Sequence, residues 1–163
     1  IAAAGVDDAL DVGLLTAIPY AVAVVSMILL ARSSDRHNER RWHLAAASIA
    51  GAAGLYASTL CGSELVLGLI ALSLGTAGVL STMPVFWTWP SSVLAGTAAA
   101  AGIAMINSIG NLAGFVSPSI IGWMKDLTHS TNAGLWVVAV ALLLGAALAL
   151  LGSAAKAPAR MRA

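Results

Sequence analysis

Two asparagines lie deep inside an apolar stretch of this chain. Asn107 and Asn111 are one helical turn apart within residues 95–121, a stretch long enough to cross a membrane. A carboxamide can donate hydrogen bonds to a carboxylate or hydroxyl group of a bound molecule. It can equally bond to a neighbouring membrane helix, an interaction worth about 0.6–2 kcal/mol. Both interpretations predict that this face of the helix avoids lipid. The small residues that continue the face are Ala100, Ala104, Gly114 and Pro118.

Two aromatic residues are further candidates for a binding site. Tyr20 directly follows Pro19 in an apolar stretch, and Trp87 lies between Pro84 and Pro90. Tyrosine and tryptophan are enriched at the two interfaces of a membrane, so both side chains fit an interfacial belt. In the alternative interpretation, Tyr20 lies on a polar face towards a cavity. Trp87 would then supply a wall for the carbon skeleton of a substrate.

A charged segment, residues 32–43, separates two uncharged stretches, 13–31 and 44–61. One arginine at the centre of a membrane helix costs about 2.5–3.5 kcal/mol, so four arginines keep this segment in water. The segment is therefore expected to be a loop between two spans, and its positive excess predicts the cytoplasmic side. Its charges are either solvated topology signals or an ion-pair latch at the cytoplasmic end. The candidate gating residues are Asp35, Arg36, Arg40 and Arg41.

The composition predicts an integral membrane protein. The chain has 163 residues, 60% hydrophobic and only 9% charged, whereas a soluble domain carries about 25% charged residues. The basic residues form two short clusters beside apolar stretches, so no nucleic-acid partner is expected. Cys61 is the single cysteine and cannot form an internal disulfide. No metal or cofactor is expected, and the histidines are expected to lie near the interfaces, with no role as ligands or proton relays.

The apolar stretches predict an all-α protein with five membrane spans. Residues 44–61 carry a stripe of small residues, Ala46, Ala50 and Gly54, that would let another helix approach closely. Alternation from the cytoplasmic loop 32–43 puts the N-terminus outside and the tail, residues 152–163, in the cytoplasm. Five spans fit part of a larger transporter. The expected spans are about 12–31, 44–61, 65–89, 95–121 and 133–151.

Three segments carry a family resemblance. They are residues 13–20 (GLLTAIPY), the charged segment from Ser34 to His43, and residues 96–115 (GTAAAAGIAMINSIGNLAGF). Together they resemble the major facilitator superfamily, and more narrowly its anion:cation symporter branch of tartrate-, sugar-acid- and phthalate-type transporters. The resemblance covers nearly the whole chain. It implies that the five spans correspond to helices 8–12 of a twelve-helix fold, a partial C-terminal six-helix bundle.

The resemblance also implies a function. The family binds its substrate between two six-helix halves near mid-bilayer. The chain is therefore expected to be the C-terminal half of a secondary transporter for small organic anions such as hydroxylated carboxylates or sugar acids. The coupling cation would be a proton or another cation, the partner the missing N-terminal half, and the location the bacterial inner membrane. The alternatives are a non-catalytic membrane scaffold or accessory subunit, or a fragment that does not transport. A membrane-embedded enzyme is disfavoured, because no carboxylate, histidine or cysteine is expected at mid-membrane depth.

Overall fold

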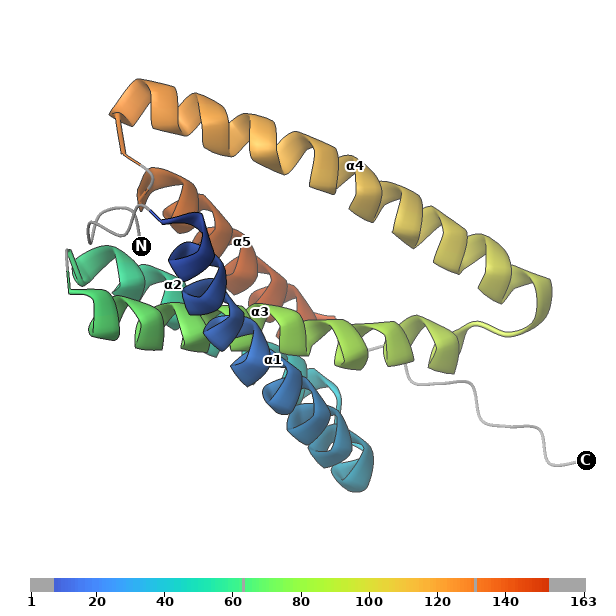
Figure 1. Cartoon of the computed structure of the whole chain (residues 1–163). Helices are drawn as coiled ribbons and strands as arrows, with labels where there is room; N and C mark the ends of the chain where they lie inside the picture. The colour runs from blue at the N-terminus through green and yellow to red at the C-terminus, as the bar shows by residue number, and fades with distance from the viewer. Residues whose placement is uncertain (1–7, 63, 131, 153–163) are drawn as a thin grey trace, which may run out of the picture.

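The computed structural model describes residues 8–62, 64–130 and 132–152, without the side chains of residues 91–93. These residues form helices and no strand, which confirms the all-α class (Figure 1). The turns between consecutive helices are short, so neighbouring helices run in opposite directions. The helices are α1 (Ala9–His37), α2 (Arg41–Leu60), α3 (Leu65–Val93), α4 (Gly96–Thr128) and α5 (Asn132–Leu151).

Four helices of the described chain, α1, α3, α4 and α5, are long and apolar enough to cross a membrane. The remaining helix, α2, has 20 residues, which also suffice to span a hydrocarbon core of about 30 Å. It is less apolar because it begins with Arg41, Trp42 and His43 and is rich in alanine and glycine. It packs against both α3 and α5. The chain is an integral membrane protein.

The charged segment is mostly helical, which corrects the expectation of a loop over residues 32–43. α1 continues to His37 and α2 begins at Arg41, so only residues 38–40 form the turn. Residues 32–37 include no proline or glycine, so the helix continues through them without a break. It ends at Asn38, which adopts the left-handed conformation with φ 50° and donates its backbone N–H to Asp35 and Ser34 carbonyls.

The closest helix contact is a crossing of glycines between α2 and α3. A Cβ added to Gly54 would lie 2.3 Å from the backbone nitrogen of Gly75. A Cβ added to Gly78 would lie 2.3 Å from the backbone nitrogen of Gly51. Such backbone approach is typical of small residues at membrane helix interfaces. The predicted stripe is therefore only partly right: Gly54 lies in the contact, but Ala46 and Ala50 line an open groove.

α5 packs against α2 through its own small residues. Ala139 is buried with Ala52 and Leu55 of α2, and Ala149 is buried with Leu44. Alanine leaves room for the neighbouring helix, and two larger residues of α5, Leu135 and Leu142, pack around this contact. Leu144 is 61% exposed. α1 packs against α3, so the helices α1, α2, α3 and α5 form one packed unit.

α4 stands apart from this unit (Figure 1). It is a continuous helix of 33 residues that passes through Pro118, and none of its residues is buried. It contacts α5 and, to a smaller extent, α3. At the α5 end, Ile121 of α4 packs over Gly134. The middle of α4 has no packing partner among the described residues.

Candidate functional site

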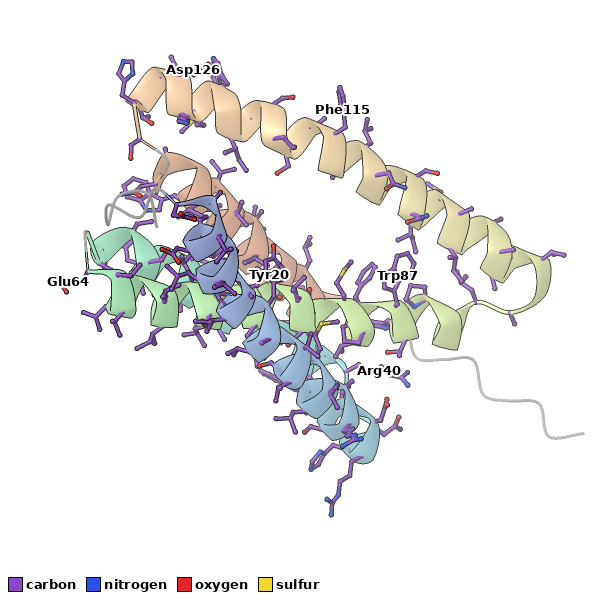
Figure 2. The ribbon with its side chains drawn as sticks, in the orientation of Figure 1. Tyr20, Arg40, Glu64, Trp87, Phe115 and Asp126 are labelled. Atoms are coloured by element: carbon purple, nitrogen blue, oxygen red, sulfur yellow. The ribbon has the colours of Figure 1, made fainter. Side chains whose placement is uncertain are left out.

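The orientation of the α4 asparagines follows from two neighbours on the same helix. Ile106 faces α3, because it lines a small groove of about 310 Å³ with Phe86 and its neighbours. Successive residues of an α-helix are rotated by about 100°, so Asn107 lies about 100° and Asn111 about 140° around the helix from Ile106. Phe115, about 180° from Ile106, projects away from the other helices (Figure 2). Asn111 therefore points away from α3, and Asn107 points sideways.

Both asparagines are exposed within this chain. In the described part of the chain, neither side chain hydrogen-bonds to another helix. Ala100, Ala104, Gly114 and Pro118, which continue the predicted face, are exposed as well. The predicted face of α4 is therefore continuous, but it is exposed along its length in the described part of this chain.

The two aromatic candidates lie on other helices. Tyr20 of α1 is 60% exposed. The indole of Trp87, near the end of α3, packs edge-on against Phe86 with ring centroids 5.6 Å apart. Figure 2 shows Tyr20 and Trp87 at separate positions along the bundle. This chain therefore does not bring the four predicted binding residues together into one cavity, and their role in binding stays a prediction.

The four gating candidates differ in their surroundings. Asp35 and Arg36 are exposed at the end of α1, whereas Arg40 and Arg41 are half-buried at the start of α2. The Arg41 guanidinium donates a hydrogen bond to the carbonyl oxygen of Leu150 in the last turn of α5. Carbonyls at a helix C-terminus lack intrahelical partners and carry partial negative charge, so a cation there is favourable. Arg41 thus ties α2 to α5, a role that its sequence position did not reveal.

Two histidines of the turn form a small network that the sequence analysis missed. His37 Nδ1 lies 2.8 Å from the carbonyl oxygen of Ser33, and His43 Nε2 lies 3.0 Å from the Ser33 hydroxyl. The two imidazole rings stack with centroids 6.1 Å apart. The network joins the end of α1 to the first turn of α2. The sequence did contain a signal for this network, because both histidines lie within one or two helical turns of the short connection between α1 and α2.

A groove between α2, α3 and α5 is apolar. It has a volume of about 550 Å³, with Leu44, Phe86 and Leu148 among its lining residues. Its two hydroxyl side chains, Ser48 and Thr82, donate to carbonyls of their own helices. These hydroxyl groups are therefore already paired, and the mainly apolar lining does not suit a polar anion.

Known transporters match this chain over most of its length. A protein of Agrobacterium vitis named "Putative tartrate transporter" is 49% identical over 143 residues, which are 88% of this chain and 32% of that protein. "Putative metabolite transport protein NicT" of Pseudomonas putida is 44% identical over 86% of this chain and 32% of its own length. "Inner membrane transport protein RhmT" of Escherichia coli is 36% identical over 80% of this chain.

These matches show the class of protein. The chain belongs to the major facilitator superfamily, whose members are transporters and not enzymes. It spans about a third of the length of the curated relatives that it matches. No family model matches the chain. No solved structure matches it either.

Proposed function

We propose that this chain is the C-terminal part of a secondary transporter for small organic anions such as hydroxylated carboxylates or sugar acids. The observation that carries the proposal is the 44–49% identity with tartrate and metabolite transport proteins over 86–88% of the chain. The five helices would be helices 8–12 of a twelve-helix protein. The other helices of that protein would be the principal partner of this chain.

The exposure of α4 supports the proposal that other helices of the transporter pack against this chain. α4 carries two carboxamides in its apolar stretch and has no buried residue, and it is the least apolar of the four candidate spans. Polar side chains inside a membrane face other helices or a water-filled cavity. The exposed face with Asn107 and Asn111 would therefore complete a cavity with the rest of the transporter. The amides would there donate hydrogen bonds to a substrate carboxylate or hydroxyl group.

The proposal includes coupling of transport to a cation, and this part rests on the family resemblance. The described acidic residues lie at helix ends or in turns: they are Asp8, Asp11, Asp35, Glu39, Glu64 and Asp126. None lies in the middle of a span, where a proton carrier would be expected. A proton or another cation would therefore be bound by residues outside this chain.

The proposed location is a bacterial inner membrane with the α1–α2 turn in the cytoplasm. Arg40 lies at one end of the bundle and Glu64 at the other (Figure 2). Arg40 is one of four arginines at the α1–α2 turn. An excess of arginine favours the cytoplasmic side, which puts the start of α1 outside and the end of α5 inside.

Uptake into proteoliposomes tests the proposal. The complete transporter that contains this chain is reconstituted and supplied with radiolabelled tartrate, a sugar acid or an aromatic acid, with and without a proton gradient. Saturable uptake of at least one anion is expected, and stimulation by the gradient would support proton coupling. Absence of uptake for every acid, in a protein that remains folded, would favour the alternative of an accessory subunit. The chain alone is expected not to transport, because α4 lacks its partner.

A further inference from the structure

A second groove lies between α1 and α2, with α3 as its floor. Its volume is about 480 Å³. Most of its lining is aliphatic or small, so it suits a hydrocarbon chain better than a polar solute. The apolar lining includes Leu29, Leu30, Ala46, Ala50, Leu74 and Ala77.

The basic residues of the α1–α2 turn continue the walls of this groove. Arg32 and Arg36 follow Leu29 by three and seven residues, so they extend the same face of α1. Trp42 precedes Ala46 by one turn on α2 and is 61% exposed. Both arginines are exposed, and neither pairs with an acidic side chain in the described part of the chain. The groove therefore has a basic rim with an interfacial tryptophan beside it.

Hydroxyl groups lie between the basic rim and the apolar body. α1 and α3 run in the same direction, and Ser33 and Ser81 are the groove-lining residues nearest to their C-terminal ends, so they are the ones closest to the rim. Ser81 is only 3% exposed, and its Oγ is buried without a hydrogen-bond partner. Ser33 contacts His43 through its hydroxyl. A further serine, Ser26, lines the groove at its deeper end.

The two acidic residues of the turn do not neutralise this rim. The Glu39 carboxylate accepts a hydrogen bond of 3.0 Å from the backbone N–H of Trp42, so it caps α2. Asp35 is exposed and leaves both arginines unpaired. The α1–α2 turn as a whole has four arginines and two carboxylates, so it carries an excess of positive charge.

We propose that the groove between α1 and α2 binds one anionic phospholipid. One acyl chain lies along Leu29, Ala50 and Leu74, the ester region lies near Ser81, and the phosphate lies between Arg32 and Arg36. Basic pockets between helices at a membrane surface are typical sites for anionic head groups. The order of basic rim, hydroxyl groups and apolar body matches the order of groups in a phospholipid. In the orientation proposed above, this lipid belongs to the cytoplasmic leaflet, but the binding itself does not depend on transport.

Native mass spectrometry of the detergent-solubilised protein tests this assignment. The protein is titrated with phosphatidylglycerol or phosphatidylcholine of identical acyl chains, and the bound fraction is measured. Tighter binding of phosphatidylglycerol is expected in the unchanged protein. Arg32→Gln and Arg36→Gln should each weaken phosphatidylglycerol binding about fivefold. Phosphatidylcholine has the same phosphate but a cationic head group, so its binding should weaken less. Lys125→Gln, which removes an exposed charge at the other end of the bundle, is the matched control and should have no effect.

A second pair of variants tests the apolar body. Ala46→Leu places a larger side chain in the groove and should reduce binding of both lipids. Ala53→Leu makes the same change on α2 but in a different groove, between α2 and α5, and should leave phosphatidylglycerol binding unchanged. Equal binding of the two lipids, or equal effects of Arg32→Gln and Lys125→Gln, would overturn the proposal. So would full competition by glycerol phosphate, which has the charged head but no acyl chain.

Discussion

Gly54 of α2 and Gly75 of α3 lie in direct backbone contact. A Cβ on Gly54 would lie 2.3 Å from the nitrogen and 2.7 Å from the Cα of Gly75. Because backbone atoms cannot rotate away, the helices must separate to accept a methyl group. Overpacking typically costs 1–3 kcal/mol. We expect Gly54→Ala to lower the free energy of unfolding in detergent by about 3 kcal/mol, measured by titration with a denaturing detergent.

Gly68→Ala is the matched control for this prediction. Gly68 lies on the same helix as Gly75, and an added Cβ would meet nothing within 4 Å. Alanine favours a helix over glycine by about 0.5–1 kcal/mol, so this change should be neutral or stabilising. If the two substitutions have equal effects, the glycine crossing does not determine the distance between α2 and α3.

The bond from Arg41 to the Leu150 carbonyl makes a second prediction. Arg41→Met keeps an unbranched apolar stem but removes the charge and the donors. Hydrogen bonds to charged groups contribute about 1.5–3 kcal/mol, and the half-buried position of Arg41 puts the loss at the lower end. The end of α5 should then separate from α2 first. Amide hydrogen exchange should accelerate in the last turn of α5 and remain unchanged in α3.

Arg36→Met controls for the loss of a positive charge at the same end of the molecule. Arg36 is exposed on α1 and does not reach α5. Exposed substitutions usually change stability by less than 0.5 kcal/mol. Faster exchange at the end of α5 in both variants would mean that the charge of the turn matters, and not the bond to Leu150.

The sequence predicts the number and order of the helices well, because charge and hydropathy determine which segments enter lipid. It does not predict the register of their contacts. Ala46, Ala50 and Gly54 recur every four residues, yet the α2–α3 crossing uses Gly51 and Gly54. The residues of both sets, Ala46 and Ala50 as well as Gly51 and Gly54, are small enough for close helix packing. The choice depends on the matching glycines of α3, which a pattern within α2 does not contain.

The binding site is the least predictable part. Asn107 and Asn111 share a face with small residues, which predicts a buried or cavity-lining side. In the described chain this face is exposed, because α4 makes few contacts with α5 and α3 and has no buried residue. The same applies to Tyr20, which is 60% exposed. A face on one helix does not specify which surface it meets.

Asp35 provides a prediction about gating. It is exposed and forms no ion pair in the described part of the chain, so Asp35→Lys should change stability by less than about 0.5 kcal/mol. If Asp35 forms a latch with another part of the transporter, the substitution should shift the protein away from the outward-open state. Accessibility of a cysteine placed at the cytoplasmic end would then rise. Glu64→Lys, at the opposite end, should leave it unchanged; equal accessibility in both variants contradicts the latch.

Trp87 gives a prediction about the cavity wall. Its ring contacts Phe86 at the end of α3, close to the groove that Ile106 of α4 shares. A cysteine at position 87 should react with a water-soluble maleimide in the complete transporter, and substrate should slow the reaction. A cysteine in place of Trp136, which donates a hydrogen bond to Thr59 at the end of the bundle opposite the α1–α2 turn, is the belt control. Reaction of position 87 that substrate does not slow would make Trp87 a belt residue.

Asn107 provides the most direct test of the site. In the complete transporter, Asn107→Ala removes the carboxamide but leaves a good helix former in place. Loss of a hydrogen bond to a carboxylate should lower uptake at low substrate concentration about tenfold or more. Asn111→Ala should have a similar or smaller effect. Ser108→Ala changes another exposed polar residue of α4, about 100° around the helix from Asn107, and should leave uptake unchanged.

The readout that separates binding from structure is the ratio of uptake to folded protein in the membrane. A binding role predicts that Asn107→Ala lowers uptake while the amount of folded transporter stays constant. A purely structural role, in which the amide bonds to another helix, predicts that both fall together. Asn107→Gln then distinguishes direct contact further, since it keeps the amide but moves it by one methylene. Partial recovery of uptake in that variant, with a raised KM, is expected if the amide contacts the substrate.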